Sequence, residues 1–291
     1  MRRYLLGFVI LGLGACGGST PSEPPKSSDQ TLQRETSAGQ LALQLERPEE
    51  AVARYQEALT RAQARDDLSA IGDLGYNLAV AELEANQPGR ALDAARSTEQ
   101  ELQRRGAAPF PGLPLVEATA LYRLGDLDGA ERLVSKAAKT GDKQAAQRAA
   151  FLGGLIADER GEQQKLVAAA KALEGATDPS LQADAAELTA RLALRQGDAN
   201  AARKAAAHAA SLRQQTIDYR GLARALALGG AAAKRAGDDK AAADLYLRAG
   251  RSAASQGDKQ AARSWLREAV DLASDDTVRD AANKLLKETG S

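Results

Sequence analysis

A helix–turn–helix signature recurs along most of the chain and restricts the possible fold more than any other feature of the sequence. Each turn residue, usually Gly, has a small residue seven positions before it and an apolar residue five positions after it. The turn residues are Glu46, Asn86, Gly125, Gly161, Gly197, Gly237 and Gly257. The residues seven positions earlier are Gly39, Ala79, Ala118, Gly154, Ala190, Gly230 and Gly250. The residues five positions later are Ala51, Ala91, Ala130, Leu166, Ala202, Ala242 and Ala262. Small side chains at a fixed offset let two helix backbones cross closely, so the pattern predicts a series of helical hairpins.

Composition and turn chemistry agree with helices. Aromatic residues are 3% of the chain and hydrophobic residues 44%, so Ala and Leu must supply most of the buried surface, which favours helices over sheets. An acidic residue follows each turn Gly, as in Gly125-Asp126 and Gly161-Glu162, where it is suited to cap the next helix or to complement the partial positive charge of its N-terminus. We expect Ser274-Asp275-Asp276 to cap a last helix at about residues 277–287.

The spacing of the turns resembles that of the tetratricopeptide-repeat (TPR) family, whose unit is a helical hairpin of about 34 residues. The turns here lie 40, 39, 36, 36, 40 and 20 residues apart. The resemblance covers residues 32–276 and implies an all-α fold, an α-solenoid of about six or seven TPR-like repeats. The last interval implies that the helix between Gly237 and Gly257 serves two turns, which leaves the hairpin count at this end open. The Trp that the family usually carries is absent: Glu35 and Gly75 stand at that position in the first two repeats.

The N-terminus indicates export and lipid anchoring. Arg2 and Arg3 precede a short apolar run, which is typical of a signal peptide and too short to span a bilayer. The following Leu13-Gly14-Ala15-Cys16 resembles the bacterial lipobox, which implies cleavage before Cys16 and acylation of this residue, with palmitate as one expected chain. We therefore expect four segments: a lipoprotein signal peptide (1–15), the lipidated Cys with a flexible tether (16–31), the repeat array (32–276) and a C-terminal capping helix (277–291). In the lipoproteins that this motif resembles, the residue after the Cys influences sorting, and Gly17 in place of Asp implies the outer membrane if the cell has one.

The TPR resemblance also implies a partner surface, because in that family the first helix of each pair lines a concave groove. The residues that we expect in this partner groove are Tyr76, Tyr122, Arg123, Arg148, Phe151, Arg191 and Arg195. Asp184, Glu187 and Arg224 are further groove-facing candidates. Tyr and Arg often dominate interface energetics. For any single aromatic, packing between neighbouring helices is the more frequent role, and for Arg a solvated helix face.

A proline-rich loop at residues 106–114 interrupts the array. Its three prolines disfavour a helix. Phe110 and Leu113 are either a docking element or, more commonly for such side chains, they fold back over the edge of the solenoid.

Several functional classes find no support in the residues. With 39 basic and 39 acidic side chains the net charge is zero, which argues against nucleic-acid binding. One Cys and one His, His208, remove disulfide frameworks, Cys/His metal sites and most nucleophilic triads. We therefore expect no enzyme activity, no cofactor and no metal site.

The sequence favours a membrane-anchored TPR lipoprotein that acts as a protein–protein interaction scaffold or adaptor in bacterial envelope assembly. Its layout is similar to that of pilotin-like proteins and of the TPR component of the β-barrel assembly machine. We expect an envelope protein or peptide in the groove, contact with the membrane through Cys16, and a location at the outer membrane facing the periplasm. The oligomeric state is left open. The alternative is an envelope binding protein that recognises a peptidoglycan fragment or small ligand in the solenoid groove.

Overall fold

The computed structural model describes residues 29–139 and 143–290, and these residues form fourteen helices and no strand. The predicted signal peptide, Cys16 and most of the tether lie outside the described residues. The helices are α1 (Gln30–Gln44), α2 (Pro48–Ala64), α3 (Leu68–Glu84), α4 (Pro88–Arg104), α5 (Leu113–Arg123), α6 (Leu127–Ala137), α7 (Lys143–Arg160), α8 (Gln163–Ala172), α9 (Pro179–Gln196), α10 (Ala199–Gln215), α11 (Tyr219–Arg235), α12 (Asp239–Ser255), α13 (Lys259–Leu272) and α14 (Asp276–Gly290).

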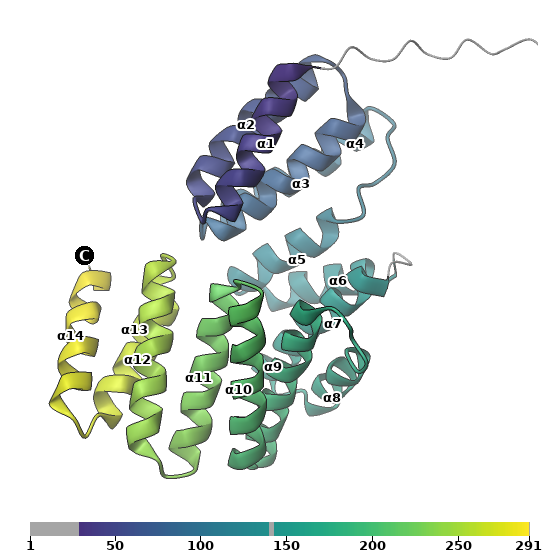
Figure 1. Cartoon of the computed structure of the whole chain (residues 1–291). Coiled ribbons are helices and arrows are strands. Elements are labelled where there is room, and N and C mark those ends of the chain that lie inside the picture. Colours follow the sequence, from purple (N-terminus) through teal and green to yellow (C-terminus); the bar gives the residue numbers. More distant parts are fainter. Residues whose placement is uncertain (1–28, 140–142, 291) are drawn as a thin grey trace, which may run out of the picture.

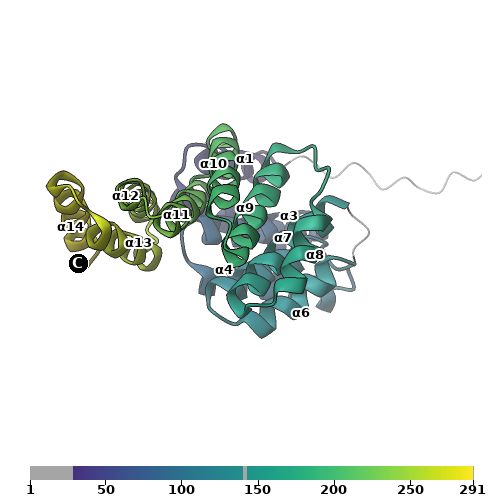
Figure 2. The same cartoon turned by 90° about the horizontal axis from the view of Figure 1, so that it is seen from below.

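Each helix packs mainly on its neighbours in the chain, which confirms the predicted all-α solenoid. Figure 1 shows α1 to α4 above the remaining helices, with the chain passing through α5 to α8 and ending at α14. The view from below in Figure 2 shows α11 to α14 extending away from the middle of the molecule. The array therefore winds as a superhelix, and its first helices stand over its later ones.

All seven predicted turn residues adopt a left-handed backbone, with φ between 57° and 84°. Gly197, for example, ends α9 at φ 84°, where the absence of a Cβ removes the usual steric cost. Glu46 and Asn86 tolerate the same conformation in the first two hairpins. The structure adds turns of this kind at Asp66, Gly106, Gly175 and Ile217.

The fourteen small or apolar positions of the signature are all buried. The seven residues that follow the turns are completely buried, at 0% exposure. The crossing positions leave no room for a side chain where they are Gly: a Cβ at Gly154 would lie 2.7 Å from Leu188 Cδ1, and one at Gly250 would lie 2.6 Å from Leu266 Cγ. The repeated small residues thus set the distance between packed helices.

The acidic residues after the turn glycines cap the next helix, with one exception. Asp126, Asp198, Asp238 and Asp258 each accept a hydrogen bond from the backbone N–H three residues later, at 2.8 to 3.1 Å. Glu162 makes no cap hydrogen bond, and its longer side chain pairs with Lys165 at 2.8 Å. This agrees with the general preference for Asp over Glu at the N-cap. Of the two roles expected for Glu162, only that of a negative charge at the N-terminus of α8 agrees with the structure.

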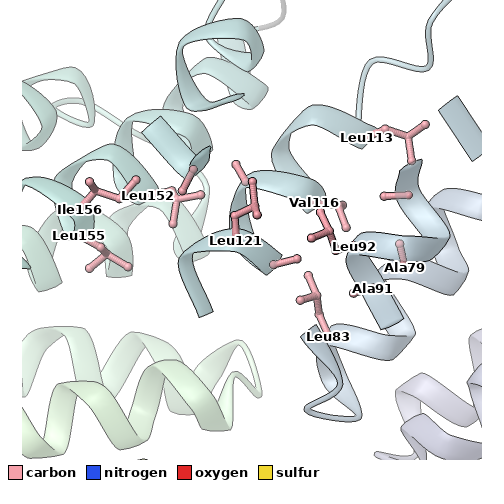
Figure 3. Packing of buried hydrophobic residues seen from close by; sticks show 14 of the residues in the cluster. Ala79, Leu83, Ala91, Leu92, Leu113, Val116, Leu121, Leu152, Leu155 and Ile156 are labelled. Carbon is pink, nitrogen blue, oxygen red and sulfur yellow. The ribbon is translucent and has the colours of Figure 1, made fainter. Parts of the chain in front are cut away.

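The hydrophobic core continues from hairpin to hairpin instead of forming one central cluster. Figure 3 shows one such cluster passing from Leu83 and Leu92 through Val116 and Leu121 to Leu152. Each hairpin therefore covers the apolar face of the next, and stability is distributed along the array.

The proline-rich loop folds back onto the solenoid. Phe110 packs against Tyr76, with ring centroids 5.5 Å apart, and Leu113 is fully buried at the start of α5. The packing role, rather than the docking role, is therefore the one that the structure shows for these two side chains.

At the C-terminal end, α12 packs on both α11 and α13, as expected from the short interval between Gly237 and Gly257. The last helix, α14, begins at Asp276, and the Asp275 carboxylate accepts a hydrogen bond from the Thr277 N–H at 2.7 Å. Among the helices of the described residues, none has both the length and the apolar character needed to cross a membrane.

Candidate partner-binding groove

The superhelix closes on itself through a few polar contacts between its first and later hairpins. Asn86, in the α3–α4 turn, donates from Nδ2 to the carbonyl of Gly257 at 2.9 Å. Arg220 donates from Nη2 to the carbonyl of Glu84 at 2.7 Å, and its Nε lies 3.6 Å from the Glu84 carboxylate. These partners are 171 and 136 residues apart in the sequence. We call the Asn86–Gly257 and Glu84–Arg220 pairs the closure contact.

An opening of about 880 Å³ lies beside the closure contact, and we call it the inner groove. Helices α5, α7 and α11, the first helices of their hairpins, supply part of its lining, while their second helices α6, α8 and α12 supply only Ala253. The α12–α13 turn and α13 supply the opposite wall. The side chains that define the groove are Tyr122, Arg123, Glu159, Arg220, Arg224 and Trp265.

Two predicted residues, Tyr122 and Arg123, meet in the inner groove at the end of α5. The Tyr122 hydroxyl donates to Glu159 Oε1 at 2.5 Å, and burial together with this carboxylate raises the pKa of Tyr122. Arg123 donates from Nη1 to the carbonyl of Leu83 at 2.6 Å. Burial lowers the pKa of Arg123 to about 10, and the nearby Arg220 guanidinium contributes. Arg123 thus stays cationic at neutral pH in a poorly solvated position.

An ionic network adjoins the groove, and its centre is the fully buried Glu187 of α9. Its carboxylate accepts from Arg224 at 2.9 Å, from Arg191 at 3.1 Å and from Arg213 at 3.3 Å. Burial alone would raise the pKa of Glu187, but the guanidiniums of Arg224 and Arg191 outweigh it and lower the pKa to about 2. Glu187 is therefore ionised and links three helices.

Two further carboxylates complete the network. Asp184 accepts from Arg213 at 2.5 Å, and burial still raises its pKa to about 6. Asp158 accepts from Arg191 at 2.8 Å and from Arg195 at 2.5 Å. Burial opposes ionisation of Asp158, but these two arginines lower its pKa. The expectation that Asp184 and Glu187 are exposed groove residues is wrong, because both are buried. Asp184 pairs with Arg213 of the same hairpin, and Glu187 also pairs with Arg224 of the next one.

The remaining predicted residues lie around the groove or away from it. The ring of Phe151 lies under the guanidiniums of Arg213 and Arg224, whose Cζ atoms are 5.7 and 5.9 Å from the ring centroid. Arg191 and Arg195 belong to the network. Tyr76 packs on Phe110, and Arg148 is exposed on α7, so neither lines the groove. A role in partner binding stays a prediction for Tyr122, Arg123, Phe151, Arg191 and Arg195, whereas Tyr76 and Arg148 lie outside the lining of the inner groove.

Local sequence reasoning missed Arg220, Lys259 and Trp265, which also line the groove. Their position depends on the closure contact, for which the hairpin signature carries no signal. The network had a usable signal: Tyr122–Glu159, Asp158–Arg195 and Glu187–Arg224 each join residues 37 apart. That interval is one repeat, so polar partners at equivalent repeat positions could have been paired from the sequence.

The described residues contain no group of three or more His, Cys, Asp or Glu side chains that could hold a metal ion. The chemistry that the groove presents is recognition by aromatic rings, guanidiniums and amides.

These features define a class, the helical-repeat interaction scaffold. Residues 243–276 match the family model of the tetratricopeptide repeat. The matched segment joins α12 to α13, so α12 closes the α11–α12 hairpin and also opens a family repeat. Residues 243–276 are therefore a tetratricopeptide repeat, and together with the helical hairpins of the described residues they support a tetratricopeptide-repeat protein. Repeats of this kind indicate protein–protein interaction. A search of curated proteins finds no match.

Two solved structures with TM-scores above 0.5 support the fold. The apo form of the quorum sensor NprR from B. thuringiensis is similar at a TM-score of 0.59 and 12% identity, covering 91% of this chain and 88% of that one. A STAND signal transduction ATPase with a tetratricopeptide repeat sensor from Pyrococcus horikoshii has a TM-score of 0.58 and 14% identity. The match covers 91% of this chain and 40% of that one. A tetratricopeptide repeat protein from Parabacteroides merdae has a TM-score of 0.47 and 16% identity. The match covers 90% of this chain and 100% of that one.

Proposed function

We propose that this protein is a lipid-anchored scaffold of the bacterial envelope whose inner groove holds a segment of another envelope protein. The inner groove itself carries the proposal, since Tyr122, Trp265 and several guanidiniums face one opening of about 880 Å³. Tyr, Trp and Arg are the residues that most often dominate binding energy at interfaces. By binding this segment, the protein acts as an adaptor in envelope assembly. Its role is similar to that of pilotin-like proteins or of the TPR component of the β-barrel assembly machine.

Copurification tests the groove. The tagged protein, crosslinked in its native cells and purified from membranes, is expected to carry a defined envelope protein. A Tyr122→Ala/Arg123→Glu variant that keeps its helicity is expected to lose this protein, whereas Arg148→Glu, on an exposed face of α7, is expected to keep it. Loss in both variants, or in neither, would contradict a role for the groove.

The lipobox-like Leu13-Gly14-Ala15-Cys16 supports the anchor and the location at the outer membrane facing the periplasm. Metabolic labelling with palmitate and membrane fractionation test it. The parent is expected to take up label and sediment with outer membranes. Cys16→Ala is expected to abolish both, while Ser19→Ala, three residues later, is expected to behave as the parent. Unchanged labelling of Cys16→Ala would reject lipid attachment at this residue.

A second candidate is recognition of a peptidoglycan fragment or another small ligand. The volume of the inner groove favours it, because about 880 Å³ lies within the roughly 300–1,000 Å³ typical of small-ligand sites. Trp265, the single Trp of the chain, lines the groove and serves as a fluorescence reporter. Saturable quenching by a muropeptide digest, with no copurifying protein, would favour this candidate over the scaffold. An unchanged spectrum would reject it.

A further inference from the structure

A second opening, of about 800 Å³, adjoins the closure contact, and we call it the outer groove. Its walls are turns and helix ends. The α1–α2 and α3–α4 turns form one wall, and the α10–α11 and α12–α13 turns form the other. Figure 1 shows the lower end of α1 facing the upper end of α11. The outer groove is therefore a site distinct from the helix faces that line the inner groove.

The turns around the outer groove keep side chains where most other turns use Gly. Four residues other than Gly have a positive φ within the described residues, and three of them, Glu46, Asn86 and Ile217, line this opening. Ile217, at φ 56°, is the most costly case, because a β-branched side chain crowds the left-handed backbone. A residue held in such a conformation points to a function for the side chain that it presents.

Ile217 presents an apolar side chain to solvent. It is 64% exposed, and Tyr219, two residues later, is 42% exposed. The half-buried Leu43 lines the facing wall. Single exposed apolar side chains are ordinary, but three around one opening form a patch that an apolar side chain of a partner can cover.

The charges around this patch are mostly negative. The outer groove is lined by four acidic side chains and one basic side chain: Glu46, Glu49, Glu84, Asp218 and Arg220. Glu84 pairs with Arg220 at 3.6 Å, and Asp218 accepts from Arg213 at 2.8 Å. Neither Glu46 nor Glu49 forms an ion pair within the described residues. The charge of Glu46 and a hydrogen bond from the Tyr219 hydroxyl raise the pKa of Tyr219, so this carboxylate lies directly beside the apolar patch.

We propose that the outer groove docks a cationic amphipathic segment of a protein partner. Its apolar side chains cover Ile217 and Tyr219, and its Lys or Arg side chains lie beside Glu46 and Glu49. The negative surplus decides the charge of the occupant, because like charges brought together at an interface cost binding free energy. This inference goes beyond the proposed function, which places a partner segment in the inner groove.

Isothermal titration calorimetry tests the docking with three acetylated and amidated peptides. The full-length protein is studied in a neutral detergent, with protein-free micelles as the reference. The peptides are Leu-Lys-Ala-Leu-Lys-Ala, Leu-Gln-Ala-Leu-Gln-Ala and Ser-Lys-Ala-Ser-Lys-Ala. The first is expected to bind about fivefold or more tightly than either other peptide, since Gln removes two exposed ion pairs and Ser removes apolar burial. Comparable affinities, or no binding of the first peptide, would overturn the proposal.

Two matched variants on α2 locate the peptide. Glu49 and Glu57 are both exposed, but only Glu49 lines the outer groove. Glu49→Gln is expected to weaken binding of the first peptide several-fold, and Glu57→Gln to leave it unchanged. The inner-groove variant Tyr122→Ala/Arg123→Glu is expected to bind this peptide as the parent does, even where it loses the copurifying protein. Equal effects of the two α2 variants, or loss of the peptide in the inner-groove variant, would overturn the docking site.

Ile217→Gly separates docking from a purely structural role. The change relaxes the left-handed turn, so the urea midpoint of unfolding is expected to rise while affinity for the first peptide falls several-fold. A higher midpoint with unchanged affinity would show that Ile217 contacts no partner and would overturn the proposal. Sedimentation analysis tests the other occupant, a second copy of the chain. A dimer of the parent that dissociates in Ile217→Gly would assign the outer groove to self-association instead.

Discussion

The two separate variants Gly154→Ala and Gly153→Ala distinguish two effects on stability: the steric clash at a helix crossing and the gain in helix propensity. Both residues lie within α7, so each change removes a Gly from a helix and gains about 1 kcal/mol of intrinsic propensity. A Cβ at Gly153 would have Val134 Cγ1 as its nearest neighbour, at an ordinary 3.4 Å. A Cβ at Gly154 would lie 2.7 and 2.8 Å from the two Cδ atoms of Leu188 and 3.0 Å from Ala169 Cβ.

The magnitude follows from these distances. Carbon atoms in contact prefer roughly 3.5–4.0 Å, so either the Leu188 side chain must shift or α7 must move away from α8 and α9 by several tenths of an ångström. Leu188 is fully buried, so a shift of its side chain disturbs the residues that enclose it. Overpacking of this kind costs about 1–3 kcal/mol. Gly153→Ala is therefore expected to stabilise by up to about 1 kcal/mol, and Gly154→Ala to be about 1–3 kcal/mol less stable than Gly153→Ala.

Urea unfolding followed by circular dichroism at 222 nm measures the difference, since the propensity gain cancels between the two variants. Gly154→Leu is the stronger form of the same change and is expected to open the α7–α8 hairpin, with loss of helicity. A Gly154→Ala variant as stable as Gly153→Ala would refute the argument that small residues set the helix crossings.

Three further predictions concern charges. Glu187→Gln is expected to destabilise the protein by about 3–5 kcal/mol, because Arg224 and its neighbours would remain buried without a counter-charge; chemical denaturation measures this loss, and a change under 1 kcal/mol would contradict it. Asp258→Ala is expected to cost about 1 kcal/mol by removing an N-cap, whereas Glu162→Ala, which removes no cap, is expected to cost less; equal thermal shifts would contradict the difference. The raised pKa of Asp184 means that its contribution to stability grows as pH falls from 7 toward 5, and the lowered pKa of Glu187 means that its contribution is lost below about pH 4.5. A pH series of unfolding midpoints is expected to rise and then fall, and Asp184→Asn is expected to reduce the rise, to which the buried Glu82 and Glu117 with their raised pKa values also contribute. A rise of unchanged size in this variant would contradict the assignment.

The turns and crossings could be predicted from the sequence because each depends on about a dozen consecutive residues. Gly197 and the small residue seven positions earlier, Ala190, report the end of one helix and its closest approach to the next. Such local requirements appear in the sequence at a fixed offset.

The inner groove could be predicted only in part. The offset of Tyr122 and Arg123 to Gly125 predicts their position at the end of the first helix of a hairpin, whereas nothing in the hairpin signature predicts that Trp265 lines the same opening. The position of Trp265 in the groove depends on the total curvature of the solenoid, which brings Asn86 to Gly257. This curvature accumulates over many helices, so no short segment of the sequence predicts it. The sequence does not predict burial of Glu187, because a single charged residue is expected to be exposed until its partners are considered, and one of these, Arg224, lies a full repeat away.

Site-specific photo-crosslinking in the native cells tests directly whether the inner groove holds a partner. A photoreactive residue at Ser264, which is exposed and lines the groove, is compared with one at His208, which is exposed on α10 and lies outside it. A groove that works as a scaffold surface yields a defined protein adduct from position 264 and none of that adduct from position 208. The same adduct from both positions, or an adduct from 208 alone, would show that the partner binds elsewhere on the solenoid.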